Sequence, residues 1–479
     1  METTEFSNRD HRNILDDSNQ HYRNILEDKY KDIIEINPKL RRKLVSFQAN
    51  KKVPFYGWFS YKEGFSSEMV KMFMREYPKK SGRVLDPFAG AGTTLFSARE
   101  CGFDSVGIEL LPIGKFVFEV RKAAEEVESE KLKNSISSLK QIDFFSYNNS
   151  ICYFHHISIT EKAFSIETEQ KINGFLKYIH ENIEDEKIRK ILKFALFCIL
   201  EKISFTRKDG QYLRWDKRAG KGKTNFTKPN ILNFEEALFD QLDYILSDVS
   251  NYETMLKEGI DEKLKMNLCT GSTLEILPTV ETCSVDLIIS SPPYCNRYDY
   301  TRTYALELVF LGETDNQIKD LRQNLLSCTV ENKDKIDFLK RIYCANNRES
   351  TFNEATEAFN SNAALQEVLG ILEGYKNEKR LNNPGIYRMV KNYFYEHAFV
   401  VFEMARVLKN GGRIYYVNDN VRYAGETIPV DLILSEFAEA AGLKVKNIYK
   451  LSTGKGNSSQ QMGVHGREEV RKCVYYWEK

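Results

Sequence analysis

The stretch RVLDPFAGAGTT at residues 83–94 constrains the fold of this chain more than any other part of it. Val84 and Leu85 are typical of a buried strand, and the residues after Gly92 favour a helix over Thr93–Cys101. A strand that turns through glycines directly into a helix is typical of an α/β sheet, because backbone amides at the helix start can approach a ligand closely. The spacing differs from the G-x-G-x-x-G pattern of dinucleotide-binding proteins and from the Gly-Lys-Ser/Thr ending of phosphate-binding loops.

Two carboxylates stand at the ends of the predicted strands around this turn. Asp86 follows the first strand, where it would repel a polyphosphate but suits a cationic or amino-bearing ligand. A second strand is predicted over Ser105–Ile108, and Glu109 at its end can accept hydrogen bonds from both hydroxyls of a ribose. Gly90 and Gly92 alone fit a plain turn equally well, whereas the two acids in register favour a binding site.

A strand predicted over Val285–Ile289 runs into the unusual sequence SSPPY. Pro292 and Pro293 donate no backbone hydrogen bond, so the strand ends there and leaves a stiff corner with free carbonyl oxygens. The Ser291 hydroxyl and the Tyr294 ring flank that corner. Taken alone, the pattern also fits a simple strand-ending turn.

Strand-like and helix-like patterns alternate along the chain, which predicts an α/β fold with a largely parallel sheet. The 479 residues are more than one ordinary domain holds, so large insertions are expected. We predict an N-terminal helical arm over 1–50, a core made of 51–112, 266–312 and 387–479, and helical insertions over 113–265 and 313–386. In such sheets ligands bind beyond the carboxyl ends of the strands, so the insertions are expected at that edge.

The composition favours a soluble cytoplasmic protein. The nine cysteines include no C-x-x-C pair, which favours reduced thiols and argues against a zinc site or a disulfide framework. The seven histidines show no metal-ligand spacing, so we expect no metal. No apolar stretch approaches the roughly eighteen residues that a membrane span needs, so we expect no membrane partner. Because 69 basic and 68 acidic residues nearly balance, any nucleic-acid affinity must come from local patches.

DPFAGAGTT and SSPPY together resemble the two signature motifs of the amino-group DNA methyltransferases, which methylate cytosine N4 or adenine N6. The resemblance implies a Rossmann-like seven-stranded sheet with helices on both faces, S-adenosylmethionine as methyl donor and double-stranded DNA as substrate. It covers the predicted core and says little about the insertions. The cofactor-binding residues that it implies are Asp86, Pro87, Phe88, Gly90, Gly92, Thr93, Glu109, Leu110 and Ser272.

The resemblance also divides the cofactor among these residues. It implies that the glycine turn surrounds the methionine part, that Glu109 binds the ribose, and that Ser272 touches the adenine, although the usual aspartate is absent there. The segment PFYGWFSYKEGFSSEMV, residues 54–70, resembles the part of the family that closes over the methionine. Near the end of this segment, Ser66-Ser67-Glu68 predicts the cap at the start of a helix.

The same resemblance makes the corner of Ser291, Pro292, Pro293 and Tyr294 catalytic. The lone pair of an exocyclic amino nitrogen is delocalised into the base, so acceptors aimed at its N–H groups favour a pyramidal, more reactive nitrogen. The Ser291 hydroxyl and a proline carbonyl can supply such acceptors for an in-line transfer. Tyr294 offers a face on which a flipped base can stack. Cys295 does not form the Pro-Cys dipeptide of ring-carbon methyltransferases, so we predict a packed thiol.

Ser291 also bears on the target base. In the resembling family, serine before the two prolines goes mostly with cytosine N4, and aspartate or asparagine mostly with adenine N6. We therefore predict a site-specific, cytosine-N4 DNA methyltransferase of a restriction–modification system, with a possible cognate restriction endonuclease as partner. An adenine-N6 DNA enzyme or an RNA enzyme with the same corner is the alternative. A nucleic-acid-binding protein with a degenerate methyltransferase core is the alternative from another class.

One basic segment is a candidate for DNA contact. Residues 202–230 carry nine Lys and Arg against two Asp, interleaved with aromatic residues and glycines. This mixture suits a loop that follows phosphates and contacts bases, although a solvated loop also fits. The candidate residues are Arg214, Lys217, Arg218, Lys221 and Lys223. The recognition region is therefore placed in 113–265, with 313–386 as a supplement, although the D-P-F wording is commoner in enzymes with the opposite motif order.

Two further segments are also candidates for DNA contact. Arg297 and Arg302 directly follow the catalytic corner and can grip flanking phosphates, or pair with Asp299 for structural reasons. Residues 452–467 are too polar for a core and too long for a tight hairpin, so they suit DNA contact or a plain hairpin tip.

Overall fold

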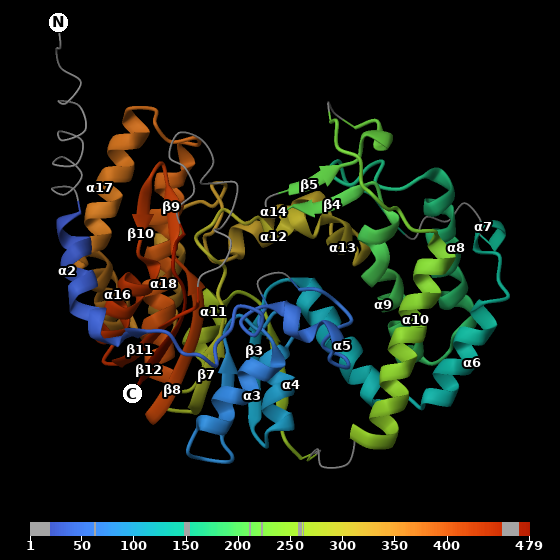
Figure 1. The fold of residues 1–479 in the computed structure, drawn as a ribbon, viewed down its shortest axis with the longest axis horizontal. Helices are drawn as coiled ribbons and strands as arrows, with labels where there is room; N and C mark the ends of the chain where they lie inside the picture. The colour runs from blue at the N-terminus through green and yellow to red at the C-terminus, as the bar shows by residue number, and fades with distance from the viewer. Residues whose placement is uncertain are drawn as a thin grey trace, which may run out of the picture.

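A central sheet of eight strands runs through the described part of the molecule (Figure 1). The structure is a computed structural model and describes residues 20–61, 64–147, 154–209, 212–221, 224–256, 261, 263–452 and 469–479. The strand order is β1-β11-β12-β8-β7-β2-β3-β6. The strands span Ile34–Glu35 (β1), Arg83–Asp86 (β2), Asp104–Glu109 (β3), Met266–Thr270 (β6), Val285–Ser290 (β7), Leu408–Asp419 (β8), Lys444–Lys450 (β11) and Lys472–Glu478 (β12).

The strand directions confirm the predicted, largely parallel α/β sheet. Neighbouring strands are parallel except at β12, which is antiparallel to both β11 and β8. Among the described residues the sheet has eight strands rather than the seven predicted, because β1 adds the pairs Ile34↔Ile448 and Glu35↔Tyr449 at one edge. A two-residue strand is too short to show a periodic pattern in the sequence.

Side chains of the central strands alternate between two buried faces. Leu85 and Ile288 belong to one hydrophobic cluster, whereas their neighbours Val84 and Leu287 belong to another. This period of two is that of a sheet buried on both sides, as a parallel sheet must be. The first face is covered by α11 (Thr273–Ile276), α15 (Ile336–Ala345), α16 (Glu349–Ser361), α17 (Ala363–Asn377), α18 (Gly385–Val407) and α19 (Val430–Ala440). The second face is covered by α3 (Ser67–Glu76) and α4 (Thr93–Glu100).

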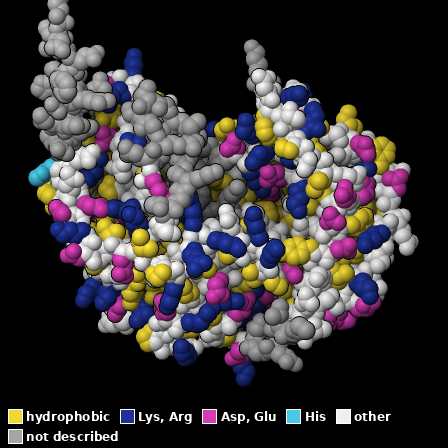
Figure 2. Space-filling model, in the orientation of Figure 1, with side chains coloured by type: hydrophobic (Ala, Val, Ile, Leu, Met, Phe, Trp, Pro, Cys, Tyr) yellow, Lys and Arg dark blue, Asp and Glu magenta, His cyan; other side chains and the backbone are white. Residues whose placement is uncertain are grey.

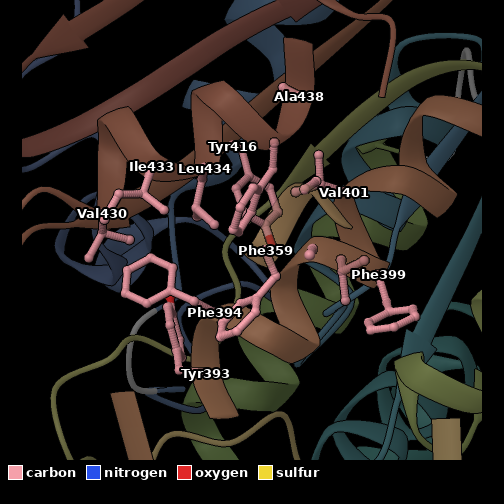
Figure 3. Packing of buried hydrophobic residues seen from close by; sticks show 14 of the residues in the cluster. Phe359, Tyr393, Phe394, Phe399, Val401, Tyr416, Val430, Ile433, Leu434 and Ala438 are labelled. Atoms are coloured by element: carbon pink, nitrogen blue, oxygen red, sulfur yellow. The ribbon is translucent and has the colours of Figure 1, made fainter. Parts of the chain in front are cut away.

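The first cluster is dense in aromatic side chains. Figure 3 shows Tyr416 of β8 among Tyr393 and Phe394 of α18 and Ile433 and Leu434 of α19. All five are buried, so α18 and α19 are fixed against the sheet. The chain order α18, β8, α19, β11 and β12 confirms the predicted helix–strand–helix–strand–strand order of residues 387–479, apart from a short hairpin between β8 and α19.

A second body, built mainly from residues 113–265, packs beside the sheet (Figure 1). Its helices are α5 (Pro112–Glu126), α6 (Ser129–Leu139), α7 (Phe144–Tyr147), α8 (Ile166–Asn182), α9 (Glu186–Ile203) and α10 (Phe234–Asn251), followed by a π-helical turn (Tyr252–Leu256). Its hydrophobic core also takes in Phe59 from before β2 and Tyr304 and Phe310 from after β7. Tyr304 lies between α12 (Tyr300–Thr303) and α13 (Ala305–Phe310), and Phe310 is the last residue of α13. The next helix is α14 (Asp315–Asn324). Segment 298–310, predicted as part of the catalytic core, therefore packs with the insertion.

Two short hairpins were not predicted from the sequence. One joins β4 (Thr206–Asp209) to β5 (Tyr212–Trp215), and the other joins β9 (Val421–Tyr423) to β10 (Glu426–Ile428). Strands of three or four residues show too few alternations to be distinguished from loops. The first hairpin lies within the basic segment that the sequence singled out.

The described part of the N-terminal arm is fastened to the core. It contains α2 (His21–Tyr30), 3-10 turns at Lys31–Ile33 and Phe47–Lys52, and β1. Arg23 forms ion pairs with Glu367 of α17 and Glu426 of β10. Over the described ranges, no helix combines the length and apolarity that crossing a membrane requires, and no group of three or more His, Cys, Asp and Glu side chains could hold a metal ion.

Candidate active site

A pocket opens where β2, β3 and β7 end. β2 pairs in parallel with both β3 and β7, so the carboxyl ends of these strands meet at one edge. Predicted residues that line the pocket are Asp86, Phe88, Gly90, Thr93, Glu109, Leu110, Ser272, Ser291 and Pro293. The structure thus brings both sequence motifs to a single cavity.

Asp86 ties the two motif strands together at the pocket floor. Its carboxylate accepts hydrogen bonds from the Ser290 hydroxyl at 2.6 Å, the Thr94 hydroxyl at 2.7 Å and the Phe88 amide at 3.0 Å. Thr94 also lies 3.3 Å from the carbonyl oxygen of Ile289 in β7. Burial raises the pKa of Asp86 to about 6, and the three donors oppose that rise.

Glu109 holds the shape of the glycine turn. One carboxylate oxygen accepts from the Gly90 amide at 2.7 Å and the other from the Leu111 amide at 2.6 Å. Burial raises the pKa of Glu109 to about 7, and the nearby charge of Asp86 adds to the rise. Each oxygen keeps further lone-pair capacity, as acceptance from ribose hydroxyls requires.

The glycine turn approaches its neighbours too closely for larger residues. Gly90 and Gly92 have φ values of 53° and 78°, and a Cβ at Gly92 would lie 2.9 Å from the Phe118 ring. A Cβ at Gly90 would meet the Tyr61 ring at 3.2 Å. The segment before β2 therefore lies against the turn, and Ser66 caps α3, as predicted, by accepting from the Met69 amide.

Aromatic side chains of that segment form one wall of the pocket, namely Phe55, Tyr56, Trp58, Phe59, Tyr61 and Phe65. Tyr61 stacks on Tyr304 at 5.6 Å between ring centroids. The guanidinium of Arg121 lies 4.0 Å from the centre of the Tyr56 ring. Two buried carboxylates, a close-packed glycine turn and an aromatic wall fit a cationic ligand that carries a ribose and an aromatic base.

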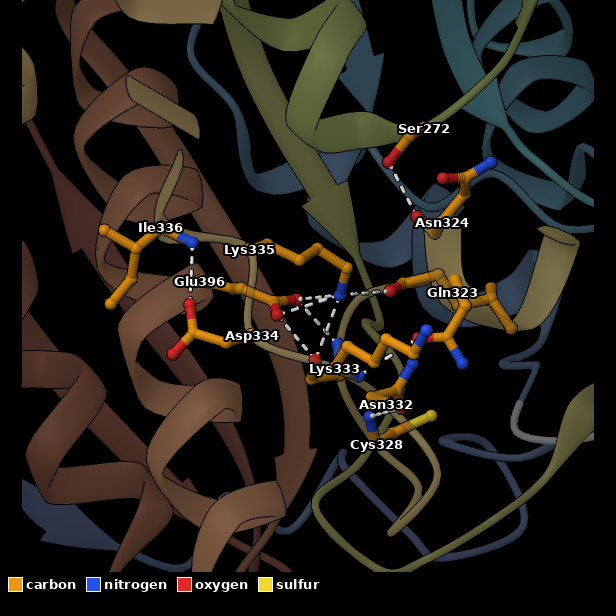
Figure 4. Close-up of polar contacts among 12 residues, drawn as sticks. Ser272, Gln323, Asn324, Cys328, Asn332, Lys333, Asp334, Lys335, Ile336 and Glu396 are labelled. Carbon is orange, nitrogen blue, oxygen red and sulfur yellow. Dashed lines mark hydrogen bonds and ion pairs between the residues drawn. The ribbon is translucent and has the colours of Figure 1, made fainter. Parts of the chain in front are cut away.

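Another part of the lining comes from the last residue of α14 and the two residues that follow it. Asn324, Leu325 and Leu326 line the pocket, and the Ser272 hydroxyl donates to the carbonyl oxygen of Asn324 at 2.8 Å (Figure 4). A buried ion pair fastens this segment to α18. Lys335 reaches Glu396 at 2.8 Å and also donates to the carbonyl oxygen of Leu325 at 3.0 Å.

Glu396 of α18 is the acidic partner in this ion pair. It is 1% exposed and accepts from the amide of Ser327 at 2.7 Å as well as from Lys335 (Figure 4). The wall that faces Ser272 therefore depends on a charged pair outside the pocket. Sequence reasoning assigned 313–386 to an insertion and missed its contribution to the pocket, because neither Leu325 nor Leu326 stands in a recognisable motif.

The predicted catalytic corner directly follows Ser290, which donates to Asp86. The Ser291 hydroxyl lies 3.2 Å from the carbonyl oxygen of Val417 and 3.1 Å from the Tyr294 hydroxyl, and it can donate its hydrogen to either. Tyr294 is 2% exposed, and Lys472 Nζ lies 5.4 Å from its ring centre. Pro292 and Tyr294 do not line the pocket in its described form, nor do Pro87 and Gly92. Cys295 is fully buried, and burial raises the pKa of its thiol, as a packed thiol requires.

Several candidate DNA-contacting residues are engaged in local pairs. Arg218 donates two hydrogen bonds to Asp216, and Lys221 donates to the carbonyl oxygens of Ser158 and Glu161. Arg302 pairs with Asp299 at 3.3 Å and with Glu331 at 3.0 Å, which is the structural pairing that the sequence left open.

Other candidates point outward. Arg214 is half-exposed, and the Lys217 side chain is exposed. Arg297 lies 3.4 Å from the Asn382 side-chain oxygen. Lys223 and most of 452–467 lie outside the described residues.

Comparisons with known proteins agree with this site. A family model described as DNA methylase matches residues 4–112. The chain is 49% identical over 459 residues to the type II methyltransferase M.AvaI of Anabaena variabilis, covering 94% of this chain and 92% of that protein. It is 40% identical over 469 residues to the type II methyltransferase M.BsoBI of Geobacillus stearothermophilus, covering 94% and 91%. No solved structure matches the chain.

The chain therefore belongs to the amino-group, N4/N6 family of DNA methyltransferases. Members of this family take their methyl group from S-adenosylmethionine. The pocket has the chemistry that this cationic, ribose-bearing cofactor requires.

We expect Asp86→Asn to lower S-adenosylmethionine affinity by roughly 10- to 100-fold, because a charge-assisted hydrogen bond contributes about 1.5–3 kcal/mol. Asparagine keeps an acceptor for Ser290, so the fold should persist. Isothermal titration calorimetry measures the affinity, and circular dichroism checks the fold. Unchanged affinity would exclude Asp86 from cofactor binding.

Cofactor affinity should rise with pH through about 7 and level off above it. Glu109 has a pKa raised to about 7, so its contribution to the stability of the unliganded protein is present at low pH and is lost as pH rises through 7. Acceptance from two ribose hydroxyls requires the ionised form, so affinity falls by up to about tenfold per pH unit below 7. Titrations at pH 6, 7 and 8 measure this slope. Glu109→Gln is the control, and a slope equal to that of the unaltered protein would refute the assignment.

Lys335→Met should weaken cofactor binding although Lys335 lies outside the pocket. Removing one partner of a buried pair destabilises a protein by about 3–5 kcal/mol, and here the loss falls on the wall around Leu325. Adding Glu396→Gln removes the unpaired charge and should restore much of the stability. Thermal unfolding with and without cofactor reports both effects. Lys171→Met, which breaks a partly buried pair in α8, is the control that should leave cofactor affinity unchanged.

Proposed function

We propose that this protein methylates N4 of cytosine at a specific sequence in double-stranded DNA, as the modification enzyme of a restriction–modification system. The observation that carries the proposal is the position of Ser291, which lines the cofactor pocket while its hydrogen is directed at Val417 or Tyr294. A lone pair of that hydroxyl is left to accept from an amino group. Serine at this place goes mostly with cytosine N4 in the family.

The residues of the chain act by positioning. When bound, the cofactor would supply an electrophilic methyl group. The hydrogen bond from Ser290 to Asp86 holds the adjacent Ser291 in place at the edge of the pocket. Acceptance by Ser291 and by a proline carbonyl orients the amino nitrogen and favours its lone pair for in-line attack. The amino nitrogen oriented in this way would gain the methyl group and release one proton to solvent, with the electrons of the broken sulfur–carbon bond left on the cofactor. The raised thiol pKa of Cys295 argues against a covalent intermediate on that residue.

Tyr294 is assigned the stacking face for the flipped base. Its ring is almost fully covered in this structure, so base entry has to uncover it. Lys472, whose Nζ lies over the ring and pairs with Asp419 at 3.3 Å, is one described group that base entry would displace. The helical body over 113–265 is assigned to target recognition, and a cognate endonuclease is the expected partner.

The deciding experiment is a transfer assay with product analysis. Purified protein is incubated with unmethylated genomic DNA and labelled S-adenosylmethionine, and the digested nucleosides are separated by mass spectrometry. We expect N4-methylcytosine, and we expect Ser291→Ala to reduce turnover by roughly 100-fold, since one oriented acceptor contributes about 2.7–4 kcal/mol in comparable sites. Cofactor affinity should not change in this variant.

Other products would revise the proposal in different ways. N6-methyladenine would keep the mechanism and overturn the choice of base. Methylation of RNA alone would overturn the substrate. Cofactor binding without any methylated nucleoside would favour the degenerate, binding-only alternative.

A further inference from the structure

The exposed face of the β4–β5 hairpin carries two arginines side by side. Arg207 and Arg214 are directly opposed in the antiparallel register, and both side chains are exposed. Tyr212, next along the same face, is 51% exposed. Like charges at directly opposed positions destabilise a hairpin, so folding alone does not account for this pair. Asp209, 3.9 Å from Arg214, is the one acid on this face among the described residues.

The other face of the hairpin is buried against the pocket side of the molecule. Leu213 is 4% exposed, and Lys208 forms an ion pair with Glu307 of α13, which is 1% exposed. Lys208 also lies 4.7 Å from the ring centre of Tyr304. Tyr304 in turn stacks on Tyr61 in the pocket wall. Packed contacts therefore connect the hairpin to the glycine turn, and its outward face has a fixed position relative to the pocket.

The hairpin stands in a suitable place for a large substrate. In Figure 1 it lies above the sheet near α12 and α14, on the side of the molecule where the strands end. Figure 2 shows Lys and Arg side chains gathered near the centre of this face of the molecule. A basic surface of this kind complements the phosphates of a duplex.

We propose that the β4–β5 hairpin enters the major groove of the DNA and that Arg207 and Arg214 read base edges there. This inference rests on the proposed DNA-modifying function and deepens it. The major groove admits a two-stranded β-ribbon, and arginine offers paired donors that match O6 and N7 of guanine. Arg214 also lies 4.3 Å from the Phe226 ring centre, which orients its guanidinium. The hairpin therefore selects guanine-containing sequences flanking the target base.

The test compares the unaltered protein with Arg207→Lys/Arg214→Lys and Arg207→Ala/Arg214→Ala. Lysine keeps the charge and loses the paired donors. Genomic DNA is methylated in vitro, the modified positions are mapped by single-molecule sequencing, and DNA affinity is measured at several salt concentrations. We expect the lysine variant to keep its salt dependence while methylation at sites that lack the flanking guanines rises at least tenfold relative to cognate sites. The alanine variant should show the same relaxation and bind cognate DNA roughly 10- to 100-fold more weakly.

The controls separate this inference from the function on which it rests. Arg75→Ala removes an exposed arginine on α3, at the far end of the molecule in Figure 1, and should change neither site choice nor affinity. Cofactor affinity should be unaltered in all variants, and the melting temperature should not fall, because both arginines face solvent and repel each other. A uniform loss of affinity on every sequence, with a shallower salt dependence, would overturn base reading in favour of phosphate contact. Unchanged site choice and affinity would overturn the inference altogether. The identity of the methylated base in the unaltered protein tests the proposed function independently.

Discussion

The buried carboxylate of Asp86 is the interaction on which the site depends. It stands at the end of β2 and accepts from Ser290 at the end of β7, so a single group joins the two strands that carry the sequence motifs. Thr94 at the start of α4 completes the link, because its hydroxyl contacts both Asp86 and the backbone of Ile289. The position of Ser291 relative to Asp86 is therefore fixed by hydrogen bonds at the centre of the sheet.

The two buried carboxylates of the pocket are ionised only at an electrostatic cost, and a cationic cofactor can reduce that cost. Asp86 and Glu109 are both buried, and the pKa of each is raised, with the charge of Asp86 contributing to the rise at Glu109. A cation in the pocket stabilises both ionised forms, and hydroxyl donors stabilise Glu109 further. Cofactor binding should consequently stabilise the folded protein in proportion to its concentration relative to the dissociation constant. The same physics explains why the pocket is unsuited to a polyphosphate.

The polar part of the pocket was largely predictable, because its acidic residues, its glycine turn and its serine stand in or close to two short contiguous motifs. Asp86, Gly90, Glu109 and Ser291 follow strands whose burial pattern is legible in the sequence, so their convergence follows from the parallel sheet. The wall at Leu325 was not predictable, because it reaches the pocket through the Lys335–Glu396 pair, whose partners stand about sixty residues apart with no motif around them. The hairpins were missed since strands of three or four residues carry no measurable period. Within the basic segment, only coordinates could separate Arg214, which lies 3.9 Å from Asp209, from Arg218, which Asp216 holds at 2.8 Å, since both side chains are half-exposed.

Two buried ion pairs fasten segments that lie next to the pocket. Lys335–Glu396 fastens the wall after α14 to α18, and Lys208–Glu307 fastens the hairpin to α13. Such pairs contribute little net stability, because desolvation opposes their attraction and well-packed apolar residues could replace them. They differ from apolar packing in direction, since the charges must meet at one geometry. Their effect here is therefore on register: each one fixes where its segment lies relative to the pocket, whereas a hydrophobic contact of equal area would leave that segment freer to slide.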